Sequence, residues 1–75
     1  MELLHVEKKV RLTPREREVI EHLLQGEKRE AIAGELDVSV WTVDFHLLNI
    51  RRKLGADSMI AVAIFFASNP AKLRS

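Results

Sequence analysis

A row of side chains between residues 39 and 55 has the residue types and the spacing to bind a partner molecule. In a helix, which turns about 100° per residue, these side chains share one side. The row consists of Trp41, Asp44, Phe45 and Leu48. A carboxylate such as that of Asp44 can accept a hydrogen bond from cytosine N4, and the apolar members can contact thymine methyl groups. We interpret the row as the base-facing surface of a helix that enters a DNA groove.

Two features of the row leave other interpretations open. The carboxylate of Asp44 repels the phosphates that line a groove. The exposed aromatic side chains of Trp41 and Phe45 have a second explanation, which is packing against residues 1–11 or against a domain outside this chain. The row therefore either sets base preference or serves as a contact surface for another protein.

A capping signal and the apolar spacing predict the first two helices that support this row. Thr13 can cap a helix whose first position is Pro14, and Glu16 completes a capping box with the threonine. The inward face and the end of this helix are Val19, Ile20, Leu23, Leu24 and Gly26. A second helix is expected over residues 28–36. Its inward residues are Ala31, Ile32 and Leu36, and its small residues, which permit close approach of a neighbour, are Ala33 and Gly34.

The row itself lies on a third helix, which Ser39 caps and Gly55 ends. Its inward side is Val43, Leu47, Ile50 and Leu54, and its last turn carries the basic run Arg51, Arg52 and Lys53. Asp57 or Ser58 then caps a fourth helix over residues 59–67, which is apolar all the way round. So small a domain cannot bury such a helix on every side. Four helices without strands predict an all-α fold.

Length and composition limit the functions that this chain can have. Its 75 residues suit one domain, expected over residues 12–69, with a linker or arm at 1–11. A C-terminal tail is expected at 70–75, of which residues 71–75 should fray. A net charge of +1 does not by itself mark a nucleic-acid binder, so any basic surface must be local. Without cysteine there is neither a disulfide nor a thiolate metal site. No apolar run is long enough for a membrane span or a signal peptide, which predicts a cytoplasmic protein.

Sites for catalysis or for a cofactor are not expected. His5, His22 and His46 share no metal-ligand spacing, which predicts that this domain holds no metal. The chain shows neither a nucleophile beside a base nor a glycine-rich phosphate loop. These patterns predict a non-enzyme without a cofactor.

Residues 29–48 have the arrangement of a helix-turn-helix unit, in which two short helices are joined by a tight turn. The first helix would support the second, whose N-terminal half fits a major groove. An ordinary three-helix core gives the same spacing, so spacing alone does not decide between them.

The residues at these positions resemble the DNA-binding domain of LuxR/GerE-type bacterial transcription regulators. The resemblance covers residues 12–67 without a gap, through LTPREREVIEHLLQG, IAGEL and VSVWTVDFHLLNIRRKLG. The phrase VDFHLLNIRRKL is most similar to the subgroup of quorum-sensing receptors for acyl-homoserine lactones. This implies the output domain of a larger regulator that has an N-terminal signal-binding domain. A stand-alone regulator of GerE type is the alternative.

The resemblance also implies a set of contacts with double-stranded DNA. The third helix would lie in the major groove, and the fourth would help to form a homodimer that matches a palindromic operator. Phosphate contacts are expected at Thr13, Ser39, Thr42, His46, Asn49, Arg52 and Lys53. Dimer contacts are expected at Ile60, Ile64, Phe65 and Ala67.

Three positions depart from the family pattern. Trp41 and Asp44 stand where family members often have Lys or Arg, and Met59 stands where many have Arg. An acidic and apolar row would weaken binding to DNA. The second hypothesis is therefore a protein-interaction module that acts as an antagonist or adaptor of another regulator.

Overall fold

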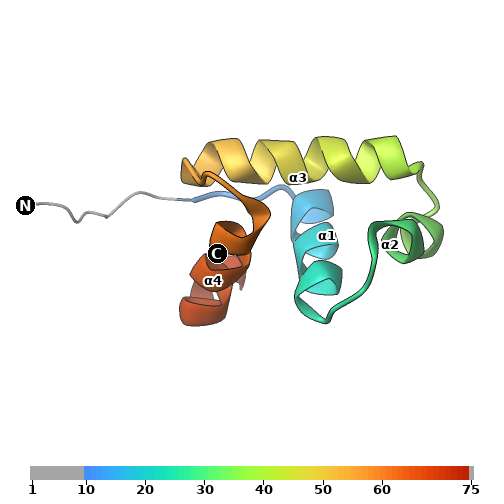
Figure 1. The fold of residues 1–75 in the computed structure, drawn as a ribbon. Helices are drawn as coiled ribbons and strands as arrows, with labels where there is room; N and C mark the ends of the chain where they lie inside the picture. The colour runs from blue at the N-terminus through green and yellow to red at the C-terminus, as the bar shows by residue number, and fades with distance from the viewer. Residues whose placement is uncertain (1–9, 75) are drawn as a thin grey trace, which may run out of the picture.

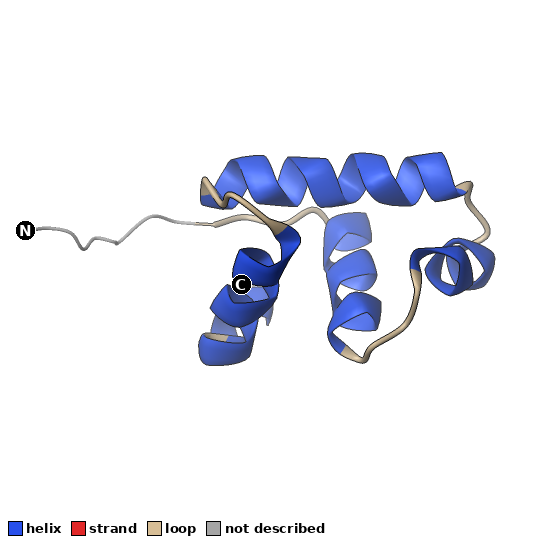
Figure 2. Cartoon of the chain, in the orientation of Figure 1, coloured by secondary structure: helices blue, strands red, loops and turns tan. Residues whose placement is uncertain are grey.

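The computed structural model describes residues 10–74, and within this range the chain forms five helices joined by short loops (Figures 1 and 2). They are α1 (Pro14–Leu24), α2 (Arg29–Leu36), α3 (Val40–Leu54), α4 (Met59–Ser68) and α5 (Pro70–Arg74). No strand occurs in residues 10–74, which confirms the all-α fold. Within the same range, no helix is long and apolar enough to cross a membrane.

Side-chain caps begin three of the helices, as the sequence predicted. Thr13 and Glu16 form the complete capping box of α1. The Ser39 hydroxyl accepts a hydrogen bond from the Thr42 backbone N–H at 3.0 Å, which starts α3. Of the two expected caps for α4, the structure uses Ser58. These hydrogen bonds satisfy backbone donors that a helix start leaves free.

The long helix α3 lies across α1, α2 and α4, as Figure 1 shows. Its inward residues Val43, Leu47 and Ile50 are buried, as predicted. They join a single apolar cluster that draws on every segment from residue 10 to α4. The buried members are Val10, Leu12, Val19, Ile20, Ile32, Ala33, Val43, Leu47, Ile50, Val62 and Phe66. Burial of this cluster is the main force that holds the short helices together.

Two residues expected to face inward and one expected to permit close approach of a neighbour do not do so. Leu24 and Ala31 are exposed, and a side chain at Gly34 would meet open space. Only Ile32 and Ala33 of α2 are fully buried. The reason is that α2 has eight residues and packs on its neighbours through one narrow side. Close approach therefore occurs at Ala33 and does not involve Gly34.

The structured region extends beyond the expected range of 12–69 at both ends. Val10, assigned to the N-terminal arm, is part of the core, while residues 1–9 lie outside the described residues. Residues 70–74 of the expected tail form α5, a helix that the sequence did not predict. Leu73 packs on the core, and its carbonyl accepts a hydrogen bond from Arg17 Nε at 2.7 Å. The domain boundary itself stays a prediction.

A buried carboxylate connects α1 to α3. Glu16 has only 4% of its surface exposed. Its Oε1 accepts hydrogen bonds from the Thr13 backbone N–H at 3.0 Å and from Lys53 Nζ at 2.6 Å. Lys53 Nζ also donates to the backbone carbonyl of Arg11 at 2.7 Å. The start of α1, the chain before it and the end of α3 therefore share one hydrogen-bonded cluster.

Replacing this carboxylate should destabilise the domain. Glu16→Ala would leave the Lys53 ammonium and the Thr13 N–H without their acceptor, so we expect a loss of roughly 2 kcal/mol in the free energy of unfolding. Urea denaturation followed by circular dichroism measures it. The control is Glu18→Ala, which removes an exposed pair with Arg15 and should change stability by less than about 0.5 kcal/mol. Equal stability of the two variants would show that the cluster does not hold α1 to α3.

Candidate nucleic-acid interface

The predicted row on α3 faces solvent. Trp41 has 72% of its surface exposed, and Phe45 and Leu48 are also exposed. The rings of Trp41 and Phe45 stack, with centroids 5.6 Å apart and an angle of 8° between their planes. This stack arises because residues four apart lie above one another on a helix. It presents a continuous aromatic surface on the first half of α3, the half expected to enter a groove.

Asp44, the fourth member of the row, is bound to an arginine of α2. Arg29 Nη1 donates to both carboxylate oxygens of Asp44 at 2.6 Å. The hydrogen bond and the charge of Asp44 raise the pKa of Arg29. The sequence predicts that this carboxylate repels phosphate, and the structure adds a guanidinium that offsets part of its negative charge. The pair also joins the two helices of the helix-turn-helix unit.

Arg29, the partner of Asp44, is the residue near this candidate interface that sequence reasoning missed. It lies fifteen residues before Asp44, on a different helix. A periodicity places residues on a face of their own helix and says nothing about pairs between helices. The available signal was the opposite charge of two exposed residues in the two halves of one helix-turn-helix unit, and it was not specific enough to identify the pair.

Hydroxyl groups gather at the N-terminus of α3. The Ser39 and Thr42 side-chain oxygens lie 3.0 Å apart, and Ser39 is exposed. Both lie at the positive end of the α3 dipole, which favours a phosphate. Thr13, expected to contact phosphate as well, is exposed at the start of α1, where its hydroxyl accepts from the Glu16 N–H at 3.1 Å.

The other four phosphate candidates on α3 differ in how far solvent can reach their side chains. Arg52 is exposed, whereas Asn49 is half-buried. His46 is also half-buried and lies beside Phe45, with ring centroids 6.1 Å apart. Lys53 uses two of its three ammonium donors on Glu16 and the Arg11 carbonyl. Its internal bonds reduce what Lys53 can offer to a phosphate, so Arg52 is the better candidate in this turn.

Helix α4 exposes an apolar stripe that consists of Ile60, Ile64 and Ala67. Ile60 and Ile64 have 72% and 61% of their surfaces exposed. Their spacing of four and three residues puts the three side chains on one side of the helix. Phe65, also expected to contact a second copy, instead packs on the core with its ring edge-on to Phe66, at a centroid distance of 5.1 Å. Packing against Phe66 turns Phe65 partly away from solvent.

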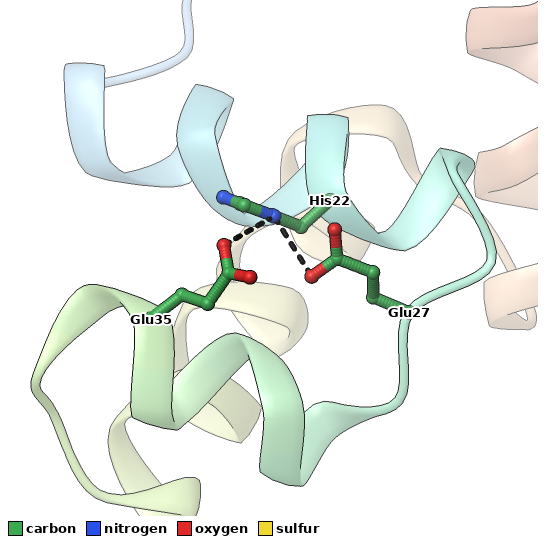
Figure 3. A group of neighbouring side chains, drawn as sticks. All are labelled: His22, Glu27 and Glu35. Carbon is green, nitrogen blue, oxygen red and sulfur yellow. Dashed lines mark hydrogen bonds and ion pairs between the residues drawn. The ribbon is translucent and has the colours of Figure 1, made fainter.

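A histidine and two glutamates meet where α1 approaches α2 (Figure 3). His22 Nδ1 lies 2.9 Å from Glu27 Oε1 and 3.5 Å from Glu35 Oε1. The hydrogen bond to Glu27 raises the pKa of His22, and the charges of Glu27, Glu35 and Glu18 act in the same direction. The prediction from sequence rested on the spacings between histidines. It could not detect this group of possible metal ligands, because two of its members are carboxylates on separate segments.

Comparison with known proteins gives one family and several relatives. Residues 10–66 match the family model GerE, described as bacterial regulatory proteins of the luxR family. The nitrate/nitrite response regulator protein NarP of Escherichia coli K12 is 42% identical over 73% of this chain and 26% of NarP. The transcriptional regulatory protein UhpA of the same organism is 44% identical over 69% of this chain and 26% of UhpA.

A shorter relative is also similar to this chain. The spore germination protein GerE of Bacillus subtilis 168 is 50% identical over 59% of this chain and 60% of GerE. In contrast, the chain spans about a quarter of the length of NarP and UhpA. The comparison with solved structures gave no match.

Proposed function

The chain belongs to the luxR family of bacterial transcription regulators, and we propose that it reads DNA with α3 and forms a homodimer through α4. The proposal that α3 reads DNA rests on its exposed row of side chains, which faces outward because the opposite side of the helix is buried. Helix α2 supports α3 through the core and through the Arg29–Asp44 pair. This is the arrangement by which a helix-turn-helix unit presents its second helix to a major groove.

Within this proposal, different residues contact the bases and the phosphates. Trp41, Phe45 and Leu48 contact base edges, chiefly thymine methyl groups. Arg52 contacts phosphate, as do the hydroxyls at the α3 N-terminus and Thr13 at the α1 N-terminus. Asn49 and His46 flank the groove, and Lys53 holds the end of α3 in place. The palindromic operator follows from two-fold symmetry of the proposed dimer.

The kind of regulator to which this domain belongs is also part of the proposal. We propose a cytoplasmic protein in which the domain is the output part, since NarP and UhpA are about four times as long as the matched region. The quorum-sensing subgroup rests on the phrase VDFHLLNIRRKL alone. None of the three relatives named above is a quorum-sensing receptor by its name, so this assignment stays a prediction.

A protein-interaction module is the second candidate, and the Trp41–Phe45 stack favours it. Trp41 has 72% of its surface exposed, and its ring stacks on that of Phe45. An aromatic surface of this type is one that another protein can cover. In this case the domain would bind another regulator through α3 and would not compete for DNA. Binding to duplex DNA separates the two functions.

Two substitutions test whether α3 reads DNA. Arg52→Ala should weaken binding to all duplexes and reduce the slope of log K against log salt by about one unit, because one phosphate contact is lost. Trp41→Ala should instead change the sequences selected from a randomised duplex pool. Fluorescence anisotropy and sequencing of the bound pool measure these effects. If the intact chain at micromolar concentration binds no duplex at low salt, DNA reading is excluded and the second function is favoured.

The Arg29–Asp44 pair allows a sharper test. Asp44→Ala removes a negative charge and releases the Arg29 guanidinium toward phosphate. We expect tighter binding to non-specific duplex and a salt slope that increases by about one unit. The double variant Arg29→Ala/Asp44→Ala should return to a slope near the original, because the released cation is absent. A slope for Asp44→Ala equal to that of the unaltered chain would mean that Arg29 does not reach the DNA backbone.

The apolar stripe of α4 generates a prediction about assembly. Ile64→Glu places a charge in the centre of the proposed dimer contact, where its desolvation is unfavourable. We expect the sedimentation mass to fall from dimer to monomer in analytical ultracentrifugation. The control is Gln25→Glu, an exposed position at the end of α1, which should leave the mass unchanged. A monomer for the unaltered chain at all concentrations would refute the α4 dimer.

A further inference from the structure

We propose that His22, Glu27 and Glu35 form a binding site for a divalent transition-metal ion, with zinc as the best fit. One ligand atom from each residue lies within 4.8 Å of the other two. The site lies between α1 and α2, on residues to which the proposed DNA and dimer contacts assign no role. It is therefore independent of the proposed function.

The distances in this cluster suit a small ion. Metal–ligand bonds of roughly 2.0–2.2 Å place two ligands of a tetrahedral zinc ion about 3.3–3.6 Å apart. The separation of 3.5 Å between His22 Nδ1 and Glu35 lies within this range, and the separation of 2.9 Å from Glu27 is shorter. An ion would require His22 and Glu27 to move apart by about 0.4 Å. Figure 3 shows both carboxylates turned toward the same edge of the ring.

The types of donor select the class of metal. A neutral imidazole nitrogen is a ligand for zinc, copper, nickel and iron, whereas magnesium and calcium prefer oxygen ligands alone. One nitrogen and two carboxylate oxygens give three protein ligands, which leaves the fourth position of a tetrahedral ion to water. With a neutral imidazole the two carboxylates bring two negative charges together, and a divalent cation offsets them.

The three ligands come from different parts of the fold, and two of them are partly fixed. His22 lies in the last turn of α1, Glu27 in the loop that follows, and Glu35 near the end of α2. The Glu27 backbone N–H donates to the His22 carbonyl at 3.2 Å, which holds the loop against the helix. His22 and Glu27 are half-buried, and Glu35 is exposed. A bound ion would therefore connect α1 to the helix that supports α3.

The experiment measures zinc binding and thermal stability of the full chain after treatment with a chelator. Isothermal titration calorimetry with ZnCl₂ should show one site per chain. At about ten times its Kd, zinc should raise the Tm by roughly 5 °C or more, because it binds the folded state alone. MgCl₂ at the same concentration should give no rise.

Matched variants locate the site. Glu35→Gln removes one carboxylate at an exposed position and should weaken zinc binding at least about tenfold while the chain still folds. The control is Glu30→Gln, an exposed residue of the same helix outside the cluster, which should bind zinc as the unaltered chain does. Zinc binding that is unaffected by Glu35→Gln, an equal effect of magnesium, or no Tm shift with zinc would each overturn the proposal.

Discussion

Val43 and Ile50 are completely buried where α3 packs on α1, α2 and α4, and this burial fixes the rotation of α3 about its own axis. Once that side faces the core, Trp41 and Phe45 have to face outward, because they lie on the opposite side of the same helix. An exposed aromatic stack is unfavourable in water, and here it is maintained by the larger gain from burying the inner side. The proposed DNA-reading surface is thus a consequence of core packing.

Charge pairs between helices then adjust this surface. Arg29 on α2 offsets part of the negative charge of Asp44 on α3, so the row presents an aromatic stack beside an ion pair. At the other end of α3, Lys53 holds Glu16 and the chain before α1, which leaves Arg52 as the exposed cation. A net charge of +1 is therefore compatible with DNA binding in this domain, since the local arrangement decides which charges face a partner.

The family assignment and the structure support different parts of the functional argument. Membership in the luxR family of bacterial regulatory proteins rests on residues 10–66. The departures at Trp41 and Asp44 are properties of this chain, and their physical meaning comes from the stack with Phe45 and the pair with Arg29.

The sequence by itself determined the first four helices, the caps of α1 and α3 and the two sides of α3, because capping and the helical period depend on residues close together in the chain. It did not reveal the Arg29–Asp44 pair, the Glu16–Lys53 pair or the meeting of His22 with two glutamates. It also assigned Val10 to an arm and residues 70–74 to a tail. Tertiary structure decided these features, because contacts between segments depend on how the helices cross, and no local pattern encodes that geometry.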